Sequence, residues 1–223
     1  MRVLKLVILL LLVLLLGSPA RAAEPLPRVR VLGDNAHRNM ARSAASELEG
    51  KVTLVIPRMP VGDSGFAISQ PGGMLAGEKW DVIYFNFGFA DSHYKDPNTK
   101  AIRAMSKLAG GVRVATPQQY EKNLRAIVQQ LKSTGAKLIW ASTTPIPHAS
   151  YDNLHDPGSE IEFNAISARV MNEQKISIND MHACVLASMD LIENKSDRTP
   201  FDFKGLSLHP PIAECILREQ QIK

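Results

Sequence analysis

Five short apolar runs, separated by helix-like segments, constrain the fold of this 223-residue chain more than any other feature. The runs are VRVLG (29–33), VTLVI (52–56), DVIYFNF (81–87), KLIWAST (137–143) and ISIN (176–179). Each is almost continuously apolar, as is typical of parallel strands covered by helices on both faces. We therefore predict an α/β fold, a three-layer, doubly wound, flavodoxin-like sheet of five parallel strands in the order 2-1-3-4-5.

Helices are predicted between these strands, over residues 36–49, 117–134 and 160–174, and a last helix begins near Pro211. The middle one is the best marked, because Thr116 can cap it, Pro117 suits its first position and Gly135 its end. Residues 57–79 and 89–115 are too long for simple connections and are rich in Gly, Pro and small residues. We expect them to wall the crevice at the carboxyl ends of the strands, where such sheets bind ligands.

The N-terminal segment predicts export. Two basic residues, Arg2 and Lys5, come before an apolar run from Leu6 to Leu16, and Ala20 and Ala22 have the spacing of a cleavage site. That run is shorter than the roughly 18 residues of a membrane span. We expect a signal peptide over residues 1–22, a single domain over 23–223, a secreted or periplasmic protein, and no stable membrane span after cleavage.

Charge and cysteine content limit the functional classes. Without the three basic residues of the signal, 23 Lys and Arg stand against 22 Asp and Glu, which argues against a nucleic-acid partner. Cys184 and Cys215 can form one disulfide or remain two buried thiols. The histidines and cysteines lack the spacing of metal ligands, so we predict no metal and no cofactor.

The turn Gly33-Asp34-Asn35 is the first candidate for chemistry. It lies where the first strand meets a helix N-terminus, a geometry that directs a side chain and backbone N–H groups into the crevice. A nucleophile is expected at position 35, but an asparagine stands there. Asparagine is also a good N-cap, so Asn35 can preserve the turn without nucleophilic chemistry.

Three segments in order resemble the first three blocks of the SGNH (GDSL) hydrolases, a family of esterases and acetylesterases. They are VRVLGDN (29–35), VGDSGF (61–66) and WDVIYFNFGFAD (80–91). The later segments 120–147 and 163–180 are similar to a secreted bacterial branch of that family. The resemblance implies an SGNH-type fold and a ligand that is an O-acyl ester or a related carbohydrate.

The resemblance also implies site residues, and the chain departs from the family pattern at several of them. The family combines a serine nucleophile, a histidine, an aspartate and an oxyanion hole built from two N–H groups and an asparagine. Here Asn35 replaces the serine and Ala90 replaces the asparagine. The remaining positions of these blocks are Gly33, Asp34, Gly62, Gly65, Gly88 and Asp91.

The last family block, Asp-x-x-His, is incomplete in either alignment. If GLSLHPP is the block, His209 is the base and Leu206 replaces the acid; if DRTPFDFKG is the block, Asp197 is the acid and Pro200 replaces the base. We therefore expect an exported SGNH-like protein of esterase ancestry with little or no serine-type hydrolysis.

An active ester hydrolase is the alternative. Ser64 in Gly62-Asp63-Ser64 spells the nucleophile triplet, and Asp152 to His155 spells the last block, but both are displaced. We interpret Ser64 as a loop serine and the second motif as a solvated loop. In the alternative, Ser64 attacks with His209 or His155 as base, or a histidine activates water; it requires Ser64 Oγ within about 3.2 Å of a histidine nitrogen, or one water away.

Other polar residues at this edge have a structural and a ligand-binding interpretation. Asn86 ends the third strand, and Thr143 and Thr144 end the fourth, where packing or turn formation competes with contact to a polar ligand. His93 and His148 are expected on exposed loops of the same face, with His93 a candidate donor near Ala90. His37 is expected on the surface of the first helix.

Overall fold

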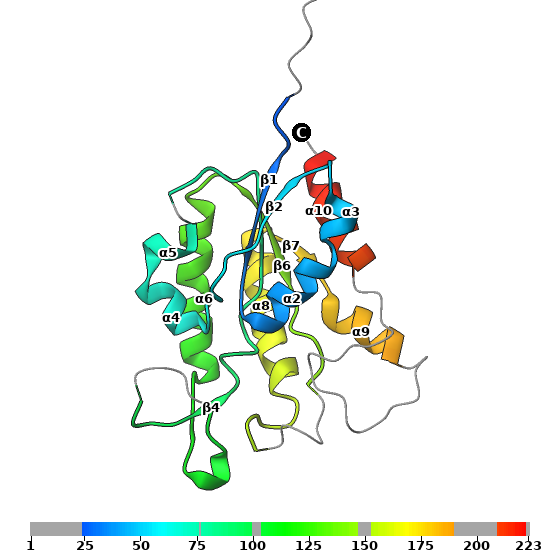
Figure 1. Ribbon diagram of the computed structural model, residues 1–223. Helices are drawn as coiled ribbons and strands as arrows, with labels where there is room; N and C mark the ends of the chain where they lie inside the picture. The colour runs from blue at the N-terminus through cyan, green and yellow to red at the C-terminus, as the bar shows by residue number, and fades with distance from the viewer. Residues whose placement is uncertain (1–23, 76, 100–103, 147–152, 190–208, 222–223) are drawn as a thin grey trace, which may run out of the picture.

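A five-stranded parallel sheet forms the centre of the protein (Figure 1). The computed structural model describes residues 24–221 except 76, 100–103, 147–152 and 190–208. The strands are β1 (Arg28–Leu32), β2 (Thr53–Val55), β3 (Val82–Phe85), β6 (Lys137–Ala141) and β7 (Ser177–Asn179). Their order is β2-β1-β3-β6-β7, with every neighbouring pair parallel. Counted along the chain this is 2-1-3-4-5, so the predicted fold class is confirmed.

Helices cover both faces of the sheet and make the three layers visible in Figure 1. One layer contains α4 (Ser64–Ser69), α5 (Pro71–Leu75), α6 (Pro117–Lys132) and α8 (Ser159–Gln174). The other contains α2 (Asn35–Ser43), α3 (Ala45–Leu48), α9 (Met181–Met189) and α10 (His209–Gln221).

Each face of the sheet has its own hydrophobic core. Ile83 and Phe85 face the α6/α8 layer and pack with Leu124 and Phe163. Neighbouring strand residues alternate in direction, so Tyr84 belongs to the core under α2, α3 and α10. Because both faces are buried, the strands read as continuous apolar runs rather than alternating ones.

The local helix signals act as predicted in α6. Thr116 Oγ1 accepts the N–H of Gln119, Pro117 is the first helical residue, and the chain leaves the helix before Gly135 at φ +74°. The expected 36–49 helix is instead two helices, α2 and α3, divided at Ala44.

The N-cap of α2 is Asp34, so the interpretation of Asn35 as the cap is wrong. Asp34 Oδ1 accepts the N–H of His37 at 3.0 Å, and Asn35 is the first residue of the helix. Position 34 has the extended backbone of an N-cap, from which a carboxylate oxygen reaches the free N–H groups of the first turn, whereas Asn35 is already helical.

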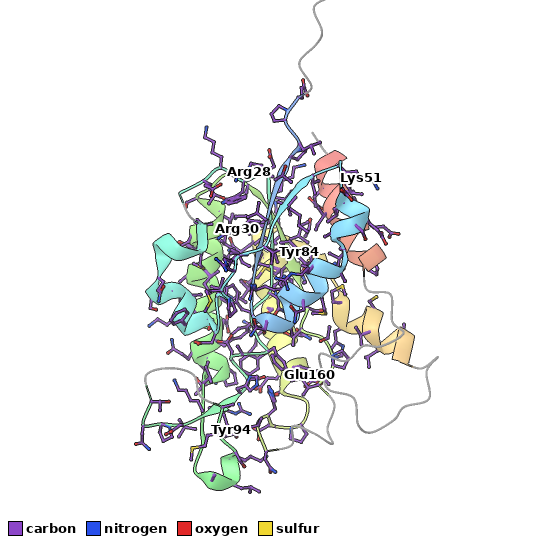
Figure 2. All side chains as sticks on the ribbon, in the orientation of Figure 1. Arg28, Arg30, Lys51, Tyr84, Tyr94 and Glu160 are labelled. Carbon is purple, nitrogen blue, oxygen red and sulfur yellow. The ribbon has the colours of Figure 1, made fainter. Side chains whose placement is uncertain are left out.

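The two long segments contain elements that have no clear sequence period. Residues 57–79 include α4 and α5, and residues 89–115 include η1 (Lys107–Ala109) and a two-stranded antiparallel sheet of β4 (Tyr94–Lys95) and β5 (Val112–Arg113). Figure 2 labels Arg28 and Tyr94 at opposite ends of the molecule, with Tyr94 on the side of the strands' carboxyl ends.

Cys184 and Cys215 are both free thiols rather than a disulfide, with Cys215 buried and Cys184 half-buried. The expected signal peptide lies outside the described residues. Within the described part of the chain, no helix has the length and apolar character of a membrane span.

Candidate functional site

The carboxyl ends of β1 and β3 and the loop after β2 meet at one point. The Gly33 carbonyl accepts the N–H of Val61 at 3.0 Å, and the Leu32 carbonyl accepts the N–H of Asn86 at 3.0 Å. Gly33 has φ +153°, and a Cβ there would lie 2.8 Å from His37 Cδ2 and 3.0 Å from the Asn86 carbonyl oxygen. Only glycine fits this approach, which brings the three family-like segments together.

Asp34 joins two of those segments. Its carboxylate accepts backbone N–H groups from Ala36 and His37 in α2 and from Ala90 in the loop after β3. Burial raises the pKa of Asp34, while these three hydrogen bonds oppose the rise. Asp34 therefore acts as a structural connection between the first turn of α2 and the Ala90 loop.

Asn35 is exposed at the start of α2 and is held by an arginine. Its Oδ1 accepts a hydrogen bond from Arg38 Nη1 at 3.0 Å. Arg38 is buried and also donates to the carbonyl oxygens of Pro57 and Arg58 in the loop after β2. The amide at the expected nucleophile position is thus oriented by Arg38, which the neighbouring loop holds in place, and it carries no hydroxyl that can attack a carbonyl.

Ser64 is buried, so its interpretation as an ordinary loop serine is wrong. It is the first residue of α4 and is 0% exposed. Its hydroxyl donates to Asp91 Oδ1 and accepts from Asn123 Nδ2 at 3.0 Å, and its N–H donates to Asp91 at 3.0 Å. Among the described residues no histidine hydrogen-bonds to Ser64, which is against its use as a nucleophile.

Asp91 lies at the centre of this buried network. Burial raises the pKa of Asp91 to about 7, with the charges of Asp63 and Asp34 adding to the rise and the bonds from Ser64 opposing it. Neither Asp63 nor Asn123 is among the site residues that the sequence predicts. The Asp-Ser-Gly order after a loop is an N-cap signal that points to Asp63, but nothing local points to Asn123 in the middle of α6.

The two candidate glycines after β2 differ in what their N–H groups do. Asp63 Oδ1 accepts the N–H of Gly65 at 2.9 Å and that of Phe66 at 3.1 Å as the cap of α4. The Gly65 N–H is therefore already used. Gly62 has φ +77° and forms the turn before this cap, which leaves Gly62 as the better candidate for an N–H donor to a ligand.

The loop after β3 keeps its glycine but not its donor side chain. Gly88 has φ +139°, and a Cβ there would lie 2.9 Å from Thr143 Oγ1. Ala90 follows, half-buried, with only a methyl group. The oxyanion donor that the family resemblance implies at this position is absent.

The polar residues at the ends of β3 and β6 bind one another. Asn86 Nδ2 donates to the Ala141 carbonyl at 2.8 Å and to Thr143 Oγ1 at 3.1 Å. Asn164 brackets the backbone of Thr143, accepting its N–H and donating to its carbonyl at 2.8 Å each. Thr144 is 4% exposed. These contacts favour the structural interpretation of Asn86, Thr143 and Thr144.

Two histidines that were expected at the surface are buried. His37 is 2% exposed and stacks on Tyr84 with 4.9 Å between ring centroids, and burial lowers its pKa to about 4. His155 is also 2% exposed, with Nδ1 2.8 Å from Ser92 Oγ and its ring 4.0 Å from that of His93; burial lowers its pKa to about 3. The solvated-loop interpretation of His155 is therefore wrong.

The remaining sequence candidates are placed only in part. Asp152, His148 and Asp197 lie outside the described residues. His209 is the first residue of α10, whose N-terminal end adjoins β7, since Asn179 Nδ2 lies 3.5 Å from the Pro211 carbonyl oxygen.

An apolar cavity of about 350 Å³ lies close to the candidate site, to which Val61 links it. Its walls come from the loop after β2 and from α4 and α5, and include Pro57, Val61, Phe66 and Met74. Val61 also donates its N–H to Gly33. The cavity is within the size range of small-molecule sites, and its apolar walls can hold an apolar group.

Sequence comparison finds no match, neither to a protein-family model nor to a curated protein. Comparison of structures does find matches over most of the chain. A lipase/acylhydrolase from Enterococcus faecalis superposes with a TM-score of 0.62 and 13% identity, covering 89% of this chain and 98% of its own. An acetyl xylan esterase superposes with a TM-score of 0.61 and 15% identity, covering 88% of this chain and 100% of its own. A protein described as a GDSL-like lipase from Parabacteroides merdae gives 0.63 and 13%, covering 92% and 100%. The chain therefore has the fold of the GDSL-type lipases, acylhydrolases and esterases.

Proposed function

We propose that this protein is an exported binding protein of esterase ancestry that holds an O-acyl compound without serine-type hydrolysis. One observation carries the proposal: the residue at the nucleophile position is an amide, Asn35, whose Oδ1 is bound by Arg38. The nearby hydroxyl of Ser64 is buried between Asp91 and Asn123. A carbonyl group at this point finds hydrogen-bond donors but no nucleophile.

The apolar cavity lined by Val61 and Phe66 supports an acyl group as part of the ligand. Its walls of Pro, Val, Phe and Met side chains favour a hydrocarbon or acetyl group, since burying apolar surface yields about 25 cal/mol per Å². The N–H of Gly62 and the amide of Asn35 then face the ester oxygens. The N-terminal sequence supports export, which places the ligand outside the cytoplasm.

The alternative of a relocated active site is less well supported. Ser64 has an aspartate and an asparagine as its side-chain partners. The alternative requires a histidine to accept the Ser64 proton, and among the described residues no histidine hydrogen-bonds to Ser64. A nucleophile also needs access to substrate, and Ser64 is 0% exposed.

Labelling with a fluorophosphonate probe tests the proposal. The purified protein without residues 1–22 is expected to show no covalent adduct by intact-mass spectrometry and no hydrolysis of p-nitrophenyl acetate above the buffer rate. In the same preparation, saturable binding of an acetylated xylooligosaccharide by calorimetry is expected. Stoichiometric labelling that disappears in Ser64→Ala would overturn the proposal and establish the relocated nucleophile.

A matched pair of variants tests whether the cavity binds the acyl group. Val61→Trp fills the apolar cavity and is expected to weaken binding of the acetylated probe at least tenfold. Val112→Trp, on the half-exposed strand β5, is the control and is expected to bind as the wild type does. Equal binding by both variants would exclude the cavity as the acyl site.

A further inference from the structure

The exposed amide of Asn35 offers a ligand its donor side. Its Oδ1 accepts from Arg38 Nη1 at 3.0 Å, and because a guanidinium only donates, the atom that faces Arg38 must be the oxygen. The Nδ2 group and the backbone N–H of Asn35 have no acceptor among the described residues, as is usual for the N–H of a first helical residue. Asn35 therefore suits a ligand atom that accepts hydrogen bonds.

Arg38, which holds this amide, is a buried cation without an acidic partner. It is 5% exposed, and its acceptors are three uncharged oxygens, those of the Asn35 side chain and of the Pro57 and Arg58 backbone. The ion pairs within the described part of the chain all use other basic residues. Buried charges in folded proteins are usually paired, so Arg38 points to a missing anion.

Arg30, the other arginine that is buried in the described structure, has the compensation that Arg38 lacks. It is 7% exposed, and its guanidinium lies 5.1 Å from the ring centroid of Trp80. Burial lowers the pKa of Arg30, and the charge of Glu78 opposes this effect. A buried arginine in this protein is thus otherwise accompanied by an aromatic face and a nearby acid.

The surroundings of Arg38 add positive charge instead. Arg42 follows one turn later on α2, and Arg58 belongs to the loop that Arg38 binds; both are exposed, and neither pairs with an acid of the described residues. Burial lowers the pKa of Arg38, the charge of Arg42 lowers it further, and the charge of Asp34 opposes both. The Asp34 carboxylate is itself engaged by three backbone N–H groups. The start of α2 is therefore positively charged.

We propose that the ligand bound at Asn35 is an anion, an acyl compound that carries a carboxylate. A carboxylate oxygen accepts from Asn35 Nδ2, while the charge of Arg38 and the positive end of α2 stabilise it through space, without contact to the buried guanidinium. Pro57, whose carbonyl Arg38 binds, also lines the apolar cavity, so the acyl group has a place nearby. The inference rests on the proposed function and adds the charge of the ligand.

Two ligands that differ in one charge test the inference by calorimetry: O-acetylated methyl glucuronoside as the free acid and as its methyl ester. The acid is expected to bind at least tenfold more tightly than the ester in about 20 mM salt, and the advantage is expected to shrink in about 500 mM salt because salt screens charges. An acid that binds no better than its ester overturns this inference alone. Failure of both, and of the acetylated xylooligosaccharide, overturns the proposed function as well.

Variants connect the preference for the acid to this site. Asn35→Asp places a carboxylate beside Arg38, at a helix position that favours negative charge, and is expected to abolish the preference for the acid over the ester. The double variant Arg42→Gln/Arg58→Gln is expected to reduce the preference at least threefold, whereas Lys122→Gln, at an exposed position of α6, leaves it unchanged. Thermal unfolding verifies that each variant folds. A wild-type preference in Asn35→Asp would refute the site.

Discussion

At the start of α2, neighbouring residues divide structural and chemical roles. Asp34 turns inward and binds three backbone N–H groups from two segments, so its role is to hold the turn and not to take part in a reaction. Asn35 is exposed and touches Arg38, so a change there affects what the crevice offers a ligand rather than how the turn is built. The geometry of the turn is therefore retained although the hydroxyl is not.

Restoring the serine alone is expected to recover little activity. Asn35→Ser supplies a hydroxyl, but Ala90 still provides no oxyanion donor, and loss of one such donor costs about 10²- to 10³-fold in turnover. We expect hydrolysis of p-nitrophenyl acetate by Asn35→Ser to stay within about tenfold of that by Asn35→Ala, the control. A gain of 100-fold or more in the single variant would contradict this.

Asp91 is expected to make stability depend on pH. Its pKa is about 7 when folded, above the value of about 3.9 for an unfolded chain, so between these values the folded state holds the extra proton. Stability contributed by this group is then present at low pH and falls as pH rises from about 4 to 7, by at most about 1.4 kcal/mol per unit.

The comparison of Asp91→Asn with wild type isolates this group. Urea unfolding between pH 4 and 7 is expected to show a flatter dependence in Asp91→Asn. Glu49→Gln, at an exposed position after α3, is expected to retain the wild-type slope. Parallel curves for wild type and Asp91→Asn would show that Asp91 is ionised throughout.

Between elements, hydrogen bonds join the insertion formed by β4, η1 and β5 (residues 94–113) to the loop before α8. The N–H groups of Tyr94 and Lys107 donate to the carbonyls of Leu154 and Asn153, each at 2.8 Å. Asp156 adds bonds from Tyr94 Oη, Lys107 Nζ and the Arg113 guanidinium. The segment 89–115 and the loop before α8 thereby form one wall at the carboxyl ends of the strands.

Removal of Asp156 is expected to loosen this wall without unfolding the protein. Burial favours the protonated form, but the bonds from Arg113, Tyr94 and Lys107 lower the pKa of Asp156 to about 2. Its contribution is therefore present above pH 4 and is lost as pH falls towards 2. In Asp156→Ala, amide exchange at Tyr94 and Lys107 is expected to accelerate about tenfold or more at pH 7.

The control for this variant is a carboxylate elsewhere that pairs with two arginines. Glu121 on α6 pairs with Arg125 and Arg169 at the surface. Such exposed pairs contribute little, so Glu121→Ala is expected to leave exchange at Tyr94 and Lys107 unchanged. Unchanged exchange in Asp156→Ala as well would show that the backbone bonds alone hold the insertion.

For the whole molecule, two apolar cores on opposite faces of one sheet provide the stability, and no disulfide adds to them within the described residues. A disulfide typically stabilises by about 2–4 kcal/mol. Reducing agent is therefore expected to leave the thermal unfolding midpoint unchanged within about 1 °C. A decrease of 5 °C or more would mean that Cys184 and Cys215 pair in solution.

The sequence alone determined the sheet, its strand order and the major helices. Strand and helix are local properties, read from short apolar runs such as 81–87 and from caps such as Thr116, and right-handed crossovers restrict how such units assemble. The sequence also predicted what Gly33, Asn35 and Ala90 can do chemically, because the functional groups of a side chain do not depend on its surroundings.

Tertiary structure alone decided the environment of each polar group. Ser64 and Asp91 are 27 residues apart and Ser92 and His155 are 63 apart, so no local pattern reveals that they bond or that Ser64 and His155 are buried. The short helices α4 and α5 depend on capping by Asp63 and packing against α6 rather than on periodicity. Burial and hydrogen-bond partners are properties of contacts between distant segments, and they set the pKa of Asp91.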